Sequence, residues 1–147
     1  MTSLTTGRPP VAVRAAAGLW IAAVALGAVE TVIVVGSSQA GGSVLAGVLF
    51  RGGVYAAAIL TTLRMRAGRR WARLALALVL GVAGTLSLVV EPISWLADGN
   101  SLSAATAGAD LTWWAVAATR ALHVAAVWAA VPLMFTARAN AYFTPPQ

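Results

Sequence analysis

Residues 74–96 read LALALVLGVAGTLSLVVEPISWL, an apolar run interrupted by a single ionisable side chain, that of Glu91. A helix rises ~1.5 Å per residue, so about 20 residues are enough to cross ~30 Å of hydrocarbon. Three more runs of this kind lie at Ala15–Gly36, Val44–Leu63 and Trp113–Thr136. The sequence therefore predicts four transmembrane helices.

The composition leaves no room for a soluble domain beside these runs. The chain has 147 residues, of which 60% are hydrophobic and only 10% charged. We therefore expect one membrane domain over residues 1–147, an all-α, antiparallel four-helix bundle. The first run could instead be a signal peptide, since Ser38-Gln39-Ala40 resembles a cleavage site. It is longer than a usual signal core of about 7–15 residues and contains Glu30, so we interpret it as a retained helix.

Arginine is distributed asymmetrically around the four runs. The formal net charge is +6, and every basic residue is an arginine. Arginines precede the first run, fill the connection between the second and third, and follow the fourth, whereas residues 37–43 and 97–111 contain none. By the positive-inside rule this predicts an inner (cytoplasmic) membrane protein with Met1, Gly68 and Gln147 in the cytoplasm. Gly41 and Gly99 would then lie outside.

The basic connection between the second and third runs predicts a contact with anionic lipid head groups. Five arginines surround Trp71, an aromatic residue typical of the membrane interface. They are Arg64, Arg66, Arg69, Arg70 and Arg73. A nucleic-acid partner is not expected, because the arginines sit at helix ends and lack an aromatic-lined soluble platform.

The same connection carries a resemblance. All-arginine basic usage, spans dominated by Ala, Val and Leu, and the linker Gly68-Arg69-Arg70-Trp71-Ala72-Arg73 resemble the uncharacterised small four-helix membrane proteins of high-GC bacteria. The resemblance covers the whole chain and implies a membrane-embedded helical fold. It implies no activity and transfers no functional residue.

Each span carries one ionisable residue in its outer half, and together these form a candidate buried polar layer. They are Glu30, Arg51, Glu91 and Arg120, with His123 one turn from Arg120. Small and polar residues at helical spacing from them mark surfaces where membrane helices meet, so we expect these side chains to point inward. The nearest pairing is within hairpins, Glu30 with Arg51 and Glu91 with Arg120. The alternative crosses the hairpins, Glu30 with Arg120 and Glu91 with Arg51.

The polar layer has three interpretations. Pairing could serve only to fix helix register, it could form a site for a polar ligand, proton or ion, or the side chains could reach toward the outer interface. His123 is either a packed, hydrogen-bonded histidine or a titrating switch. As the only histidine it cannot form a multi-histidine metal site or bis-histidine haem ligation within one chain.

Two prolines lie inside the predicted spans. Proline removes a helix hydrogen-bond donor and disfavours the helical conformation of the residue before it. Glu91-Pro92 therefore predicts that the third helix breaks or ends at Glu91. Pro132 should loosen the fourth helix near Trp128.

No enzyme motif is present. The sequence contains no nucleophile elbow, HExxH, phosphate loop or dinucleotide fingerprint, and no cysteine. We expect no enzymatic activity and no cofactor or metal. The predicted function is that of a multi-pass membrane protein acting through helix–helix contacts, as a homo-oligomer or as an accessory subunit of a membrane complex. The alternative is a small transporter or channel that uses the outer Glu/Arg layer.

Overall fold

The computed structural model describes residues 8–37 and 43–144, and all regular structure in these ranges is helical. The helices are α1 (Val11–Gly36), α2 (Val44–Arg66), α3 (Arg70–Ala75), η1 (Leu76–Gly84), α4 (Thr85–Ala97), α5 (Leu102–Thr106), α6 (Leu111–Met134) and α7 (Ala137–Phe143). Four helices are long and apolar enough to cross a membrane: α1, α2, the joined helix Arg70–Ala97, and α6. This confirms the predicted all-helical class and the four apolar spans.

The short helices α5 and α7 were not expected from the sequence. The predicted spans also differ slightly in their bounds; the first begins at Val11 rather than Ala15, and the third at Arg70 rather than Leu74. The segment Ser38-Gln39-Ala40 lies outside the described residues.

The third span does not break at Glu91, so that prediction was wrong. Pro92 lies inside α4, which continues to Ala97. One proline removes a single backbone bond, and the neighbouring turns hold the helix together. Ser94 Oγ also donates to the Glu91 carbonyl oxygen at 2.9 Å. The irregular part of this span is instead η1, a π-helix. Pro132 is likewise accommodated within α6, near its end at Met134.

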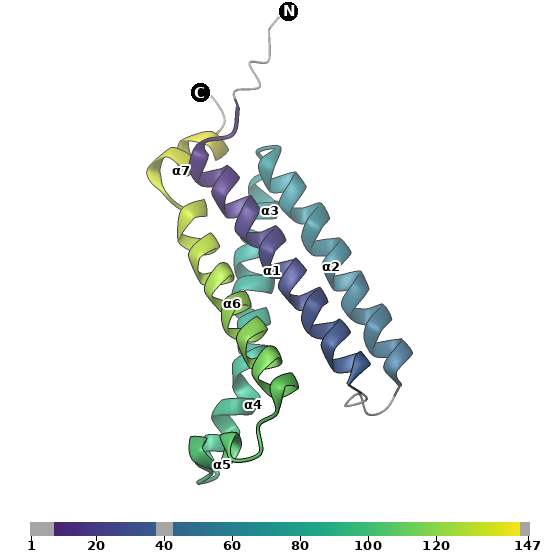
Figure 1. Ribbon diagram of the computed structural model, residues 1–147. Helices are drawn as coiled ribbons and strands as arrows, with labels where there is room; N and C mark the ends of the chain where they lie inside the picture. Colours follow the sequence, from purple (N-terminus) through teal and green to yellow (C-terminus); the bar gives the residue numbers. More distant parts are fainter. Residues whose placement is uncertain (1–7, 38–42, 145–147) are drawn as a thin grey trace, which may run out of the picture.

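The core lies toward the end of the molecule where α1 begins. α1 packs most extensively against α6 and, to a lesser extent, along α2 (Figure 1). Alanines such as Ala16, Ala23 and Ala130 are almost fully buried, and small side chains allow membrane helices to approach closely. Trp20 is also buried, and its Nε1 donates to Met134 Sδ at 3.4 Å.

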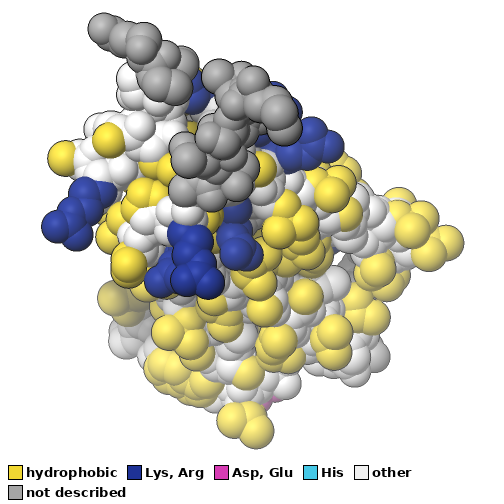
Figure 2. All heavy atoms as spheres, turned by 90° about the horizontal axis from the view of Figure 1, so that it is seen from above, with side chains coloured by type: hydrophobic (Ala, Val, Ile, Leu, Met, Phe, Trp, Pro, Cys, Tyr) yellow, Lys and Arg dark blue, Asp and Glu magenta, His cyan; other side chains and the backbone are white. Residues whose placement is uncertain are grey.

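The same end carries most of the arginines and is closed by α7. The start of α1, the α2–α3 turn and α7 lie together there (Figure 1). Tyr142 Oη donates to the Arg66 carbonyl oxygen at 2.7 Å, which ties α7 to the end of α2. Figure 2 shows this face with arginine side chains spread across it. We call it the arginine end.

The opposite end is open. Figure 1 shows α2 and α4 diverging as they leave the arginine end. α4 continues the helix of η1, makes few contacts with the other spans and buries only Thr85, and in α2 only Ala58, Thr62 and Met65 are buried. The parts of α2 and α4 far from the arginine end therefore have little protein around them.

Candidate functional site

One ion pair crosses the helices in the open half. Arg120 Nε of α6 donates to Glu30 Oε1 of α1 at 2.9 Å. The Glu30 side chain is only 8% exposed, whereas that of Arg120 is 37% exposed. Arg120 therefore balances the charge of the Glu30 carboxylate, which is otherwise enclosed by apolar helix surface. An unpaired charge there is costly.

The pairing predicted within hairpins was wrong. Glu30 binds Arg120 rather than Arg51, and Arg120 does not bind Glu91. The reason is that α1 packs mainly against α6, while α4 diverges from the other helices. Of the two pairs in the cross-hairpin alternative, Glu30–Arg120 forms. Glu91–Arg51 is not among the ion pairs of the described residues.

Arg51 is held by a hydroxyl network instead of a carboxylate. Its Nη1 donates to Thr31 Oγ1 at 3.2 Å, and Thr31 Oγ1 lies 3.0 Å from Tyr55 Oη. Thr31 Oγ1 itself donates to the Gly27 carbonyl oxygen at 2.8 Å. Because a threonine hydroxyl has one hydrogen, Tyr55 must be the donor to Thr31. The Thr31 hydroxyl thus donates once and accepts twice.

Gly27 is required for this network. A Cβ atom at this position would lie 2.9 Å from Tyr55 Oη and 3.1 Å from its Cε1. A side chain at residue 27 would therefore push the Tyr55 ring away from Thr31. Gly52 and Gly53 of α2, by contrast, face open space.

His123 lies beside the pair and faces α1. The sequence predicts only that it points inward. Its Nδ1 lies 2.8 Å from the Ala23 carbonyl oxygen. A carbonyl oxygen only accepts, so Nδ1 carries the hydrogen and, in the neutral ring, Nε2 keeps its lone pair. His123 is thus a packed, hydrogen-bonded histidine with one free ring nitrogen.

Several of these side chains line a cavity of about 230 Å³. Its polar lining comes from Glu30, Arg51, Tyr55, Ser87 and His123, and its walls are mostly apolar residues of α1, α2, η1 and α4. Glu30 is already paired, so Arg51 gives the cavity an uncompensated positive charge. The site can hold a small molecule that offers a hydrogen-bond acceptor or a negative charge to Arg51.

Sequence reasoning missed Thr31 as a member of the site. Tyr55 was detectable, because it follows Arg51 by four residues and so lies on the same helix face. Thr31 follows Glu30 directly, and only the packing of α1 on α2 turns its hydroxyl toward Arg51.

Glu91 is not part of the cavity. It lies on the exposed surface of α4 and forms no ion pair within the described residues. Arg51 is also exposed and lacks a carboxylate partner there. The structure thus joins Glu30, Arg51, Arg120 and His123 in one region and leaves Glu91 apart.

The predicted lipid-contact arginines lie at the arginine end. Four of them are exposed: Arg64, Arg66, Arg69 and Arg70. Arg73 is bound by the protein itself, since its Nη1 donates to the Met134 carbonyl oxygen at 3.2 Å and to Asn140 Oδ1 at 2.7 Å. Its guanidinium also lies 4.7 Å from the ring centroids of Phe135 and Phe143. Arg73 therefore joins α3 to the ends of α6 and α7.

No protein-family model, curated protein or solved structure matches this chain.

Proposed function

We propose that this chain is a multi-pass protein of the inner membrane that acts through helix–helix contacts with a second copy of itself. In this proposal the four spans form an antiparallel bundle with both termini in the cytoplasm. The dimer contact is formed by the outer parts of α2 and α4, and the proposed role is non-enzymatic.

The observation that carries the proposal is the pair of uncompensated charges on α2 and α4. Glu91 and Arg51 are both exposed, have opposite charge, and lack ion-pair partners within the described residues. A charged side chain at the centre of a membrane helix costs about 2.5–3.5 kcal/mol, and pairing is the usual way to reduce that cost. A second copy supplies the missing partner for both.

The two charges also lie at matching depth. Arg51 lies about 10.5 Å along the helix from the start of α2, and Glu91 lies about 9 Å from the end of α4, at ~1.5 Å per residue. Because α2 and α4 run in opposite directions, the register that pairs Arg51 with Glu91 also places Val48 opposite Ser94. A two-fold axis along the membrane normal forms the Arg51–Glu91 pair twice.

The surface of α2 is suited to such a contact. A Cβ atom at Gly47 or Gly52 would meet nothing within 4 Å. Gly47 lies one turn before Arg51 on the same helix face. Small residues that the chain does not use for its own packing allow a partner helix to approach closely.

Disulfide crosslinking tests the contact directly, because the chain has no cysteine of its own. Val48→Cys and Ser94→Cys are introduced into separate, differently tagged chains, which are then reconstituted together and oxidised. The proposal predicts a disulfide-linked heterodimer. Phe50→Cys is the matched control, since residue 50 is exposed but lies about 200° around α2 from residue 48.

Failure of the Val48/Ser94 mixture to crosslink, or equal crosslinking of Phe50→Cys, would contradict the proposed contact. If α4 instead contacts a different membrane protein, as an accessory subunit would, this mixture also fails to crosslink.

A second candidate function is that of a small transporter or channel. The cavity lined by Glu30, Arg51, Tyr55 and His123 favours it. A dimer would contribute two such cavities and eight spans. In proteoliposomes, this candidate predicts an ion or proton flux that Glu30→Gln and His123→Ala reduce while the thermal stability of each variant is retained. Flux equal to that of protein-free vesicles would exclude it.

A further inference from the structure

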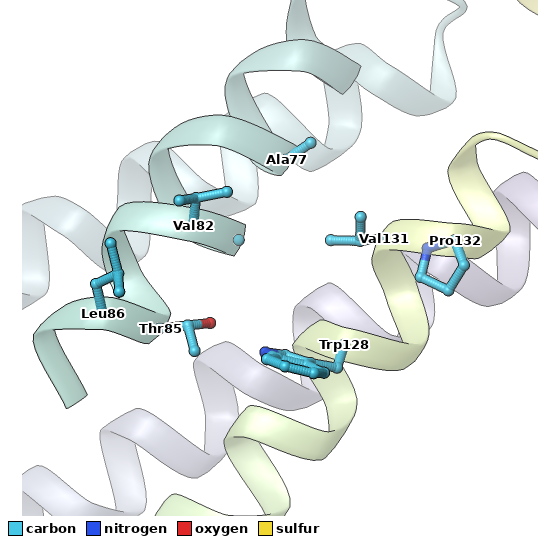
Figure 3. A pocket seen from close by; sticks show the side chains of 8 residues that line it. Ala77, Val82, Thr85, Leu86, Trp128, Val131 and Pro132 are labelled. Atoms are coloured by element: carbon cyan, nitrogen blue, oxygen red, sulfur yellow. The ribbon is translucent and has the colours of Figure 1, made fainter. Parts of the chain in front are cut away.

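A second cavity lies at the third span, away from the polar site. It has a volume of about 340 Å³, which is within the range of ~300–1,000 Å³ typical of small-molecule sites. The lining is mostly apolar and comes from η1 and the start of α4 on one side and from α6 on the other. Figure 3 shows Ala77 and Thr85 on one side of the cavity and Val131 and Trp128 on the other. We call it the η1–α6 groove.

The π-helix and the glycine within it help to shape this groove. Gly81 is buried, and a Cβ atom at this position would lie 3.2 Å from Val131 Cγ2. A larger residue at position 81 would therefore press against Val131 and alter the wall of the groove between η1 and α6. The groove is open to the side, since Val82, Leu86 and Trp128 are more than half exposed.

One end of the groove approaches the arginine end. Ala77, in its wall, lies one turn after Arg73, and Arg73 bridges to the Met134 carbonyl oxygen at the end of α6. Arg70 lies two turns before Ala77 on the same face of the helix. Arg70 is exposed and has no ion-pair partner within the described residues. A free positive charge therefore lies beyond the end of an apolar groove.

We propose that the η1–α6 groove holds one acyl chain of an anionic phospholipid whose phosphate is bound by Arg70. The charge of Arg70 and the apolar groove complement the two parts of such a lipid. Lipid tails are as apolar as the groove, so the chain alone gains little by entering it. Selectivity comes from the head group, and one arginine near the surface is expected to enrich an anionic lipid by about fivefold.

Trp128 allows a direct test, because a brominated acyl chain quenches tryptophan fluorescence on contact. The protein and its Trp128→Phe variant are reconstituted in phosphatidylcholine vesicles, and the difference between their signals reports Trp128. Brominated phosphatidylglycerol or brominated phosphatidylcholine is then titrated in. The expected result is half-maximal quenching at an about fivefold lower mole fraction of the anionic lipid.

Arg70→Gln changes an exposed side chain that forms no ion pair within the described residues, and it should abolish this difference. Gly81→Leu should abolish it as well, by altering the wall of the groove. Arg64→Gln is the matched control, since Arg64 is exposed at the end of α2 and does not line the groove. Equal quenching by both lipids in the parent protein would overturn the proposal. An equal loss in Arg64→Gln would also overturn it, because that result indicates diffuse attraction to the arginine end.

Discussion

Glu30 illustrates how a single carboxylate is accommodated among apolar helices. It is 6% exposed, and its partner comes from α6, ninety residues further along the chain. The ionisable residues of the four spans are visible in the sequence. Helical spacing also predicts that the side chains of Glu30 and His123 point inward. The choice of Arg120 over Arg51 could not, because it depends on which helix packs most closely against α1.

The Glu30–Arg120 pair predicts a specific double-mutant cycle. Arg120→Ala leaves a buried carboxylate unpaired and should lower the free energy of unfolding in detergent by on the order of 3 kcal/mol. Glu30→Ala combined with Arg120→Ala should recover much of this loss. Thermal or denaturant unfolding measures both. The observed pair would be contradicted if Glu30→Ala restored the stability lost in Arg51→Ala but did not restore the stability lost in Arg120→Ala.

At the scale of single helices, η1 is the least expected element. The apolar run of residues 74–96 predicts a membrane helix, but a π-helix has the same hydrophobicity as an α-helix and leaves no signal of its own in the composition. Pro92 was misleading for a different reason. It disfavours local helix geometry, yet it lies in a span whose remaining backbone bonds hold the helix together.

The π-helical geometry predicts how the third span tolerates a deletion. An i→i+5 ring contains one residue more than an i→i+4 ring. Removing the exposed Val79 should therefore let one turn of η1 return to α-helix without rotating its flanks, and the melting temperature should stay close to that of the parent. Removing Ala56 from the α-helical α2 rotates the two halves of that helix by about 100° against each other. We expect a clear loss of thermal stability only for the Ala56 deletion; equal losses would contradict the assignment.

At the scale of the whole molecule, the two ends differ in packing. The arginine end is closed by the core, by α7 and by the contacts of Arg73, whereas α2 and α4 diverge at the other end. The four spans and the arginine asymmetry could be predicted because hydropathy and charge are local properties of the sequence. The divergence of α4 and the two cavities could not be predicted. They depend on the balance of free energy among many weak contacts between helices.

The membrane topology predicted from arginine is tested by labelling introduced cysteines in intact spheroplasts. Gly68 and Gly99 have positive φ angles of 79° and 87°, so substitutions there are strained. Ala67→Cys and Ser103→Cys, at exposed neighbouring positions, are better choices. An impermeant thiol reagent should label residue 103 and spare residue 67. Labelling of residue 67 would reverse the orientation.

Charge reversal in mixed dimers tests whether Arg51 and Glu91 pair between two copies of the chain. Glu91→Arg and Arg51→Glu chains each bring like charges together in a homodimer, so each alone should associate weakly in bilayers. Mixed together they regain both opposite-charge pairs. Energy transfer between separately labelled chains should therefore be restored in the mixture. If the mixture associates no better than either variant alone, the pair does not form between copies. Recovery only when both changes lie in one chain would instead place Arg51–Glu91 within a single molecule.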